Sequence, residues 1–411
     1  MGRYNFAMTS VDHLTRLLPG SPEWADLLTQ IGAGARARDL NDENPFDQVA
    51  SLKRAGFGTL RLPEHLGGAG FTVPQLFSTI LDVAHADPIV AHIFRTHFWF
   101  VEERLRSADD PSSARWLHKV ADAKIFGNAF SEKGSLAVGS LVFNTRLLPA
   151  PGGGYRLNGE KYYSTGTLFS DYLTVATTAD RDSVATVVVP ADREGVRLID
   201  DWEPSVNAAI GTGTTVFADV AVSADEVLSD TPYDAEPVPT VQYASLQLYI
   251  HAVVAGILAA VVDDGVALLR SRDRSFSHAL SEKPAEDPLL QRQLGVLAST
   301  AYIAKAAVLD AAEAIAAATA SETGGLPDAD MAVEAQLKVA KVKVHLDDVA
   351  PEAATRLLEL GGASAASRQR NLDRHWRNIR TITLHNPVAY KARVIGQNVL
   401  HGTPVPANAF F

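Results

Sequence analysis

The spacing of apolar residues divides this chain into three zones. In the first zone Phe46, Val49 and Leu52 recur on one helical face, and the helical period resumes over residues 73–86. Clusters of Gly and Pro separate these segments, as expected between helices. The pattern therefore predicts an N-terminal helical domain over residues 1–125.

The pattern changes near residue 126. Short segments rich in β-branched and aromatic residues follow, and Gly or Pro punctuates them at hairpin spacing. Four such segments lie at residues 143–147, 155–159, 172–176 and 185–190. We predict a middle β-domain over residues 126–235, built as a small barrel or sandwich.

From residue 241 onward the pattern is helical again. Residues 306–320 strongly favour a helix, and residues 333–349 carry an apolar stripe opposite several lysines. We predict a C-terminal helical bundle over residues 236–411, which makes the fold class α+β in the order α, β, α. An alanine-rich bundle presents apolar faces to copies of itself, so we expect a homo-oligomer, a homotetramer built as a dimer of dimers.

Composition narrows the class of protein. A chain of 411 residues exceeds one ordinary core, and the absence of cysteine excludes disulfides, thiolate metal sites and a Cys nucleophile. A net charge of −11 argues against nucleic acid as a partner. No uninterrupted apolar run reaches the roughly 18 residues that span a bilayer, and no signal segment opens the chain. We expect a cytoplasmic protein with no membrane partner.

Standard catalytic motifs are missing from the sequence. There is no P-loop, no G-x-S-x-G, no H-E-x-x-H and no dinucleotide-binding glycine pattern that follows a strand. The 12 histidines include none that pairs at i, i+4 with a carboxylate in ligand register, so we expect no metal.

Residues 375–387 form the most informative segment. They combine two arginines, Arg377 and Arg380, with Trp376 and the imidazoles of His375 and His385, and they end on an Asn-Pro stop. Such a segment is typical of a helix end built around something planar and anionic. The alternative is a helix whose arginines satisfy backbone carbonyls while Trp376 fills the core. The residue before a proline is held extended, so the helix should end near His385, where terminal carbonyls can tune an imidazole across neutral pH.

Three further segments place polar or aromatic residues at predicted element ends. Asn128 and Ser131 can donate to carbonyl oxygens of a ligand, or they can satisfy a local turn. Ser164 and Thr165 follow two tyrosines, which can border a flat ring or form a strand with a bulge. Trp202 closes an Asp-Asp-Trp turn, as a core plug or as a stacking wall.

Single charged residues are weaker signals. His97 lies on an aromatic helix, where a lone histidine is most often a satisfied core residue. Arg272 and Arg274 alternate near a helix end, which is typical of a solvated face but also suits a phosphate. Arg370 is a further candidate for binding a cofactor.

Taken in order, these segments resemble the acyl-CoA dehydrogenase superfamily, and most closely its flavin-dependent monooxygenase branch, the dibenzothiophene monooxygenase group. The most specific match is to the pattern Trp-Arg-Asn-x-Arg-Thr-x-x-Leu-His-x-Pro. The matching segments are Thr96-His97, residues 127–132, Asn158-Gly159 with the tyrosine-serine run after it, residues 200–202 and residues 376–387.

The resemblance implies a fold and a function. It implies flavin bound between the middle β-domain and a C-terminal four-helix bundle. It further implies the oxygenase component of a two-component monooxygenase, which receives reduced FMN from a separate NAD(P)H-dependent flavin reductase. Through a flavin C4a-hydroperoxide, oxygen from O₂ would pass to a soft heteroatom, most plausibly the sulfur of an organosulfur compound. FAD stays open as an alternative cofactor.

The resemblance also implies residue roles. His385 would donate to the oxygen species or shuttle its protons, with His97 on the substrate side. Asn128 and Thr165 would hydrogen-bond the flavin or its peroxide, Trp202 would flank the ring, and an arginine would reach the phosphate across a subunit interface. The expected cofactor-binding residues are Asn128, Ser131, Ser164, Thr165, Trp202, Arg272, Arg274, Arg370 and His385.

Two departures from the family pattern bear on the reaction. Dehydrogenases place a Glu base shortly after a Gly-Gly, but here Gly361-Gly362 is followed by no carboxylate before Asp373. The dibenzothiophene enzymes have a second His where this chain has Ile382. The alternatives are an acyl-CoA dehydrogenase with FAD and a relocated base such as Asp373, an oxygenase of the same fold acting on nitrogen or aromatic carbon, and a scaffold that binds no flavin.

Overall fold

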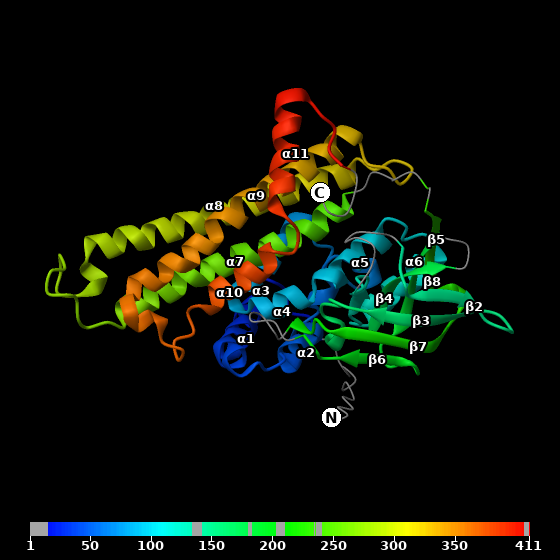
Figure 1. Cartoon of the computed structure of the whole chain (residues 1–411), viewed down its shortest axis with the longest axis horizontal. Helices are drawn as coiled ribbons and strands as arrows, with labels where there is room; N and C mark the ends of the chain where they lie inside the picture. Colours follow the sequence, from blue (N-terminus) through cyan, green and yellow to red (C-terminus); the bar gives the residue numbers. More distant parts are fainter. Residues whose placement is uncertain are drawn as a thin grey trace.

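The computed structural model describes residues 15–133, 142–179, 183–202, 210–233, 235, 241–406 and 411. Helices from both ends of the chain form an elongated body, and the sheet lies at one end of it (Figure 1). The predicted order of helices, strands and helices is confirmed.

Six α-helices precede the sheet. They are α1 (Pro22–Asn41), α2 (Phe46–Arg54), α3 (Val73–Ala86), α4 (Pro88–Ile93), α5 (Arg95–Leu105) and α6 (Pro111–Ala121). Asp87 separates α3 from α4, because its carboxylate caps α4 by accepting from the backbone N–H groups of Ile89 and Val90. The same carboxylate pairs with Arg38 at 2.7 Å, which ties this junction to α1.

The middle segment forms one eight-stranded sheet. Its strands are β1 (Phe126–Ala129), β2 (Arg146–Pro149), β3 (Tyr155–Lys161), β4 (Tyr172–Ala179), β5 (Ser183–Pro190), β6 (Val196–Ile199), β7 (Thr214–Val222) and β8 (Val227–Pro232). The order is β6-β7-β3-β2-β4-β5-β8, and β1 pairs with β4 in parallel. The predicted middle β-domain is confirmed, although of residues 143–147 only the last two lie in a strand.

A buried ion pair holds the segment that follows β1. Glu132 accepts from Lys161 Nζ at 2.7 Å, with side-chain exposures of 2% and 0%. Glu132 also accepts the backbone N–H groups of Asn144 and Thr145 at 2.7 and 3.0 Å. Because a buried charge needs a partner and hydrogen bonds, this carboxylate keeps the end of β1 in place beside β3.

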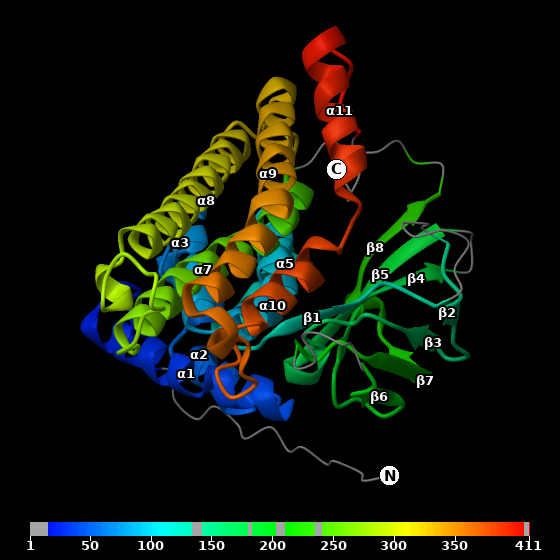
Figure 2. The same ribbon diagram turned by 60° about the vertical axis from the view of Figure 1, so that its left-hand side comes forward.

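Five α-helices follow the sheet. They are α7 (Gln242–Arg270), α8 (Pro288–Ala320), α9 (Ala329–Gly361), α10 (Arg374–Thr383) and α11 (Val388–His401). The three long helices α7 to α9 form the bundle, α10 packs against α7 and α9, and α11 packs against α9 with its far end projecting beyond the bundle (Figure 2).

The helices before and after the sheet share one hydrophobic core. The contact between α3 and α7 is very close, because a Cβ placed on Gly256 would lie 2.5 Å from Ala84 Cβ. The β-domain is therefore an insertion into a single helical body, and we propose its boundaries near residues 125 and 235.

Two helices, α7 and α8, are long and apolar enough to cross a membrane by length and composition alone. This differs from the expectation based on uninterrupted runs, because a few polar residues interrupt each run without lowering the average much. The most apolar window of α7 is 61% buried, as in the central helix of a bundle, whereas that of α8 is only 22% buried.

Candidate functional site

Three segments far apart in the sequence meet between the bundle and the sheet. The end of α10 meets the α4–α5 junction, where Arg95 Nη1 lies 3.3 Å from His385 Nε2. The loop before Gly166 packs on the last turn of α4, because a Cβ on Gly166 would lie 2.7 Å from the Ile93 carbonyl oxygen. On α5, Trp99 makes an edge contact with Phe130, directly after β1. In Figure 2, α5, α10 and β1 lie together between the bundle and the sheet.

His385 stands just beyond the end of α10, as the Asn-Pro stop predicts. Two residues that flank it in the sequence, Thr383 and Asn386, are hydrogen-bonded to side chains of the bundle helices. Buried Lys343 on α9 donates to the Thr383 carbonyl at 3.1 Å, and Asn386 Nδ2 donates to Gln247 Oε1 on α7 at 3.2 Å. These bonds fix the position of the imidazole between them.

The basic segment before His385 is a carboxylate network. His375 and Arg374 both contact Asp264 on α7, at 2.7 and 2.6 Å, and Arg377 contacts Asp39 on α1 at 2.6 Å. Arg374 and Arg377 therefore pair with acidic side chains of neighbouring helices. Arg374 also donates to the Asn371 carbonyl at 3.0 Å, and Arg380 donates to Thr383 Oγ1 at 3.3 Å.

Trp376 lies outside this network. Its side chain is 41% exposed, so the prediction that it fills the core is wrong. The preceding and following residues of α10 take the buried face of this short helix, which leaves Trp376 on the outer side.

The α4–α5 junction supplies three polar groups that sequence reasoning missed. Arg95 is 9% exposed, while His92 and Thr96 are 7% and 5% exposed. His92 Nδ1 and Thr96 Oγ1 have no hydrogen-bond partner among the residues that the structure describes. The three lie at positions 92, 95 and 96, with His92 in the last turn of α4 and Arg95 and Thr96 in the first turn of α5. Closely spaced polar residues within an otherwise apolar stretch were the sequence feature from which this part of the site could have been predicted.

The protonation of His385 follows from this arrangement. A guanidinium can only donate, so His385 Nε2 accepts from Arg95 and a neutral imidazole carries its proton on Nδ1. The residue keeps a solvent-exposed surface, but desolvation of the ring, with the nearby charge of Arg95, holds the pKa of His385 well below its usual range. We expected the carbonyls at the helix end to hold the pKa of His385 near neutral pH. The positive charges around the ring instead lower it.

Other buried imidazoles nearby are also neutral. Burial, and then the charge of Arg95, lowers the pKa of His92 to about 3. Burial, and then the charge of Lys343, lowers the pKa of His251 on α7 to about 3. Burial lowers the pKa of Arg95 to about 10, so the guanidinium stays charged at neutral pH.

His97 does not face the site. It is fully buried, Nε2 donates to the Gly58 carbonyl at 2.8 Å, and Nδ1 accepts from the Phe126 N–H at 3.3 Å. A Cβ on Gly58 would lie 2.8 Å from Nε2, so a glycine is required there. Both ring nitrogens are occupied, so the ring joins the N-terminal helices to β1, and the substrate-side role of His97 stays a prediction.

The sheet side of the site holds most of the other expected residues. Half-buried Asn128 has no side-chain partner in the described part of the chain, and Ser164 Oγ is fully buried without one. Thr165 Oγ1 is 2.7 Å from Thr212 Oγ1. Ser131 is exposed, and its carbonyl accepts from the Tyr162 N–H at 2.8 Å.

Trp202 lies against two tyrosines of the loop that carries Ser164. Its ring centroid is 5.1 Å from that of Tyr163 and 6.2 Å from that of Tyr162. Its Nε1 is buried with no partner in the described ranges. Asp201 fixes this turn by accepting from the Thr214 N–H and hydroxyl, both at 2.7 Å.

The expected phosphate-binding arginines lie elsewhere in the chain. Arg272 donates to the Leu360 carbonyl at 2.6 Å and so closes the end of α9, and Arg274 is exposed. Their loop joins α7 to α8 at the end of the bundle away from the sheet (Figure 1). Arg370 is half-buried in a loop held by α1, through Asn371 and Asp39 at 2.7 Å. Within one chain, these arginines and His385 are not brought together.

The candidate dehydrogenase base is also remote. Asp373 is 55% exposed and pairs with Arg377 at 2.8 Å, at the start of α10. His385 lies beyond the other end of this 10-residue helix, about 15 Å away at 1.5 Å per residue. No carboxylate contacts Arg95, His92 or His385 within the described residues.

Comparisons with known proteins agree with this geometry. Residues 248–390 match the family model of the acyl-CoA dehydrogenase C-terminal domain. The structure superposes on the TdsC protein of Paenibacillus sp. A11-2, solved with FMN and indole, with a TM-score of 0.84 at 28% identity, covering 94% of this chain and 99% of that one. The chain has an acyl-CoA dehydrogenase-like fold.

Relatives of similar length belong to the monooxygenase branch. The chain is 29% identical to dibenzothiophene monooxygenase of Mycolicibacterium goodii, over 90% of this chain and 91% of the relative. It is 27% identical to the probable FMNH2-dependent monooxygenase SfnC of Pseudomonas putida, over 94% and 95%. The predicted resemblance is confirmed.

We predict that His92 and His251 stay neutral as the pH falls from about 8 to about 5, and that His385 shows no inflection near its usual pKa of about 6.5. Their lowered pKa values mean that the unfolded chain binds more protons than the folded one below about pH 6.5, so stability must fall as the pH drops through this window. NMR titration of ¹³C-labelled histidines checks the first point and denaturant unfolding at each pH the second. An inflection of His385 near neutral pH contradicts the assignment.

Proposed function

We propose that this chain is the oxygenase component of a two-component monooxygenase that uses reduced FMN and O₂ to oxygenate sulfur in an organosulfur compound. The carrying observation is His385, a neutral imidazole whose Nδ1 has no hydrogen-bond partner among the described residues and which lies beside unpartnered polar groups between bundle and sheet. Similarity over about nine-tenths of the chain to dibenzothiophene monooxygenase supports the same reaction class.

The residues around the site fit a flavin. An isoalloxazine ring presents carbonyl oxygens and ring nitrogens that accept hydrogen bonds. Buried donors without partners in the described ranges lie on the segments that flank this region, namely Ser164 Oγ, Thr96 Oγ1 and the Nε1 atoms of Trp99 and Trp202. Burying such donors unpaired is costly, so a planar acceptor between the sheet and α5 explains their retention.

The roles of the residues follow from their positions. Bound reduced FMN supplies the activation of O₂ and the oxygen atom. Asn128, Ser164 and Thr165 hold the ring from the sheet side, and Trp202 covers it. His385 keeps a proton at Nδ1 and offers it to the reacting oxygen, while the packed walls around it exclude water. Ser131 stays a candidate at the mouth of the site, and Arg272, Arg274 and Arg370 can serve only if another subunit brings them.

The dehydrogenase alternative has little support. Proton abstraction next to a thioester needs a carboxylate at the site, and Asp373 is paired and remote. Oxygenation of nitrogen or aromatic carbon uses the same cofactor chemistry and is tested by the choice of substrate. A cytoplasmic location is part of the proposal, with α7 and α8 as bundle helices.

The cofactor proposal predicts a nearly colourless purified protein that binds reduced FMN more tightly than oxidised FMN. NADH should be consumed, and a sulfur compound oxygenated, only when a separate flavin reductase is added. Affinity for FMN and FAD in both redox states, followed by product analysis, measures this. Copurification of tightly bound FAD that an acyl-CoA reduces would falsify the proposal.

Replacing the proton donor tests the role of His385. In His385→Phe the ring bulk is kept and the Nδ1 proton is lost, so product formation should fall by roughly 10²–10⁴-fold, as is typical of general acid–base groups. Flavin binding should persist, and hydrogen peroxide release should rise because reduced flavin is oxidised without product. His118→Phe, an exposed position on α6, is the control. Product within a few-fold of wild type rules out the role.

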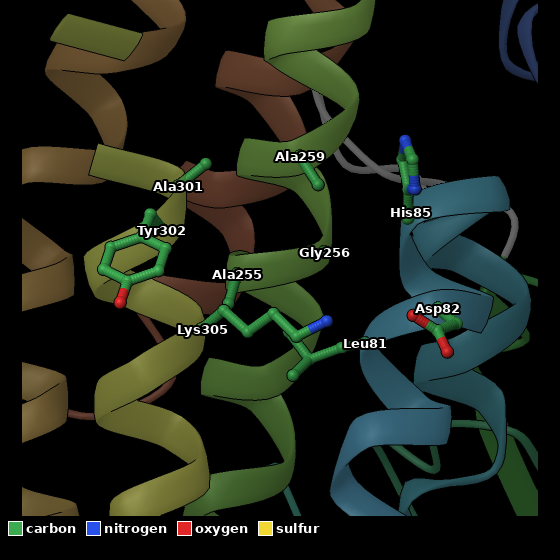
Figure 3. A pocket seen from close by; sticks show the side chains of 9 residues that line it. All are labelled: Leu81, Asp82, His85, Ala255, Gly256, Ala259, Ala301, Tyr302 and Lys305. Carbon is green, nitrogen blue, oxygen red and sulfur yellow. The ribbon is translucent and has the colours of Figure 1, made fainter. Parts of the chain in front are cut away.

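The outer face of α8 supports the proposed homotetramer. Leu289, Tyr302 and Ile303 are 63%, 76% and 51% exposed on a helix whose apolar window is mostly uncovered. Beside Tyr302 lies a hollow of about 230 Å³ between α3, α7 and α8, with the small residues Gly256, Ala259 and Ala301 in its wall (Figure 3). An apolar face and a hollow of this kind are suited to burial against another copy of the chain.

Light scattering should give four chain masses at micromolar concentration. Tyr302→Glu should lower the mass, because it puts a charge into the buried face of the assembly. Lys119→Glu, on the exposed side of α6, should not. A single chain mass for the wild-type protein excludes the assembly.

A further inference from the structure

Arg95 differs from the other buried cations of this protein. Three others have a carboxylate within 2.8 Å, in the pairs Lys53–Asp171, Lys161–Glu132 and Lys343–Asp347, and buried Lys391 lies over the Phe411 ring. Arg95 is 9% exposed and has none among the described residues. Its only partners are the Leu246 carbonyl, 3.1 Å from Nε, and His385 Nε2, 3.3 Å from Nη1.

A buried charge without a counter-ion is strongly unfavourable. The guanidinium is not relieved by losing its proton, because it stays charged at neutral pH. The surrounding imidazoles add no negative charge, since His92 and His385 are neutral. Since no described residue supplies the negative charge, a bound molecule is well suited to supply it.

The groups beside Arg95 are suited to an oxyanion. At the same α4–α5 junction, Thr96 Oγ1 and His92 Nδ1 lack partners in the described part of the chain. A hydroxyl, an imidazole and the free N–H groups of the guanidinium can together bind two oxygens of one anionic group. Arg is the cation best matched to such planar, two-oxygen recognition.

The position of this anion indicates whether it belongs to the substrate or to the cofactor. The phosphate of FMN is joined to the ring by a ribityl chain, so it lies away from the reacting end of the flavin. Arg95 contacts His385, the residue placed at the reacting oxygen. An anion bound by both therefore belongs to the molecule that is oxygenated.

We propose that the substrate is an organosulfur anion whose oxygens pair with Arg95, with a sulfinate as the best-fitting class. This inference rests on the proposed function. A sulfinate carries both the charge and a sulfur lone pair, whereas a sulfonate has no lone pair and a neutral sulfide has no charge.

The reaction balances as R–SO₂⁻ + O₂ + FMNH₂ → R–SO₃⁻ + FMN + H₂O. The sulfur lone pair forms the new S–O bond while the O–O bond breaks. Two electrons come from sulfur and two from the reduced flavin. The flavin's two protons leave with the second oxygen atom as water.

Binding is measured first, without turnover, by calorimetry. Benzenesulfonate has the charge of the product and is inert, and phenyl methyl sulfone is its neutral counterpart. Wild type should bind benzenesulfonate at least about 10²-fold more tightly than the sulfone, the effect expected of a buried charge pair. This comparison needs no variant. Equal affinity for the two compounds overturns the inference.

Variants then assign the effect to one side chain. Arg95→Gln should lose about 10²-fold in benzenesulfonate affinity, and Arg95→Lys should keep part of it. Arg104→Gln, on the same helix with its Nη1 near Ser113, should bind as wild type. Unfolding curves show whether Arg95→Gln is folded, since Nε also holds the Leu246 carbonyl. Unchanged affinity in folded Arg95→Gln contradicts the proposal.

Turnover separates this inference from the proposed function. With reduced FMN and O₂, benzenesulfinate should be oxygenated with a kcat/KM well above that of methyl phenyl sulfide. If only the sulfide is oxygenated, the anion inference fails and the monooxygenase function stands. If neither is oxygenated while benzenesulfonate binding still depends on Arg95, the proposed function fails and the anion site stands.

Discussion

The packing of α3 against α7 is the constraint on which the rest of this structure depends. Gly256 lets the two helices approach until no side chain fits between them, and the apolar residues of both chain ends then form one core. The sheet is carried as an insertion in that core. Residues 290 positions apart, Arg95 and His385, come into contact as a result. The candidate site exists only because the two ends of the chain fold as one body.

Within that body, charge is distributed unevenly. Most buried cations have a carboxylate in contact, and these pairs act as fasteners between elements, as Glu132 does for the end of β1. Around His385 the pattern changes, because Arg95 and neutral imidazoles gather there and no carboxylate among the described residues contacts Arg95. The same desolvation that keeps His385 neutral would make a flavin, an oxyanion and a proton donor interact strongly in this place.

The segment most specific to the family has two tasks. Arg377 and His375, with the preceding Arg374, anchor α10 to Asp39 and Asp264, so these side chains act on position and not on a ligand. The chemistry is concentrated in His385, just past the end of the helix. This whole segment resembles the corresponding segment of the monooxygenases. The proposal of an anionic substrate for this chain rests instead on Arg95, which has no carboxylate partner among the described residues.

The sequence by itself determined the order of helices and strands, the helix end before Asn386-Pro387 and the family resemblance, because local spacing, turn residues and a contiguous motif encode these features. It identified His385, Asn128, Ser164 and Thr165 as candidates, whose roles stay proposals. Only the tertiary structure decided that His97 is enclosed between Gly58 and Phe126 and that the arginines of α10 are paired. It also placed Arg95 and His92 beside His385. A linear pattern reports which face a residue takes on its own helix, but its partners come from other helices, and burial beside them sets its charge and its role.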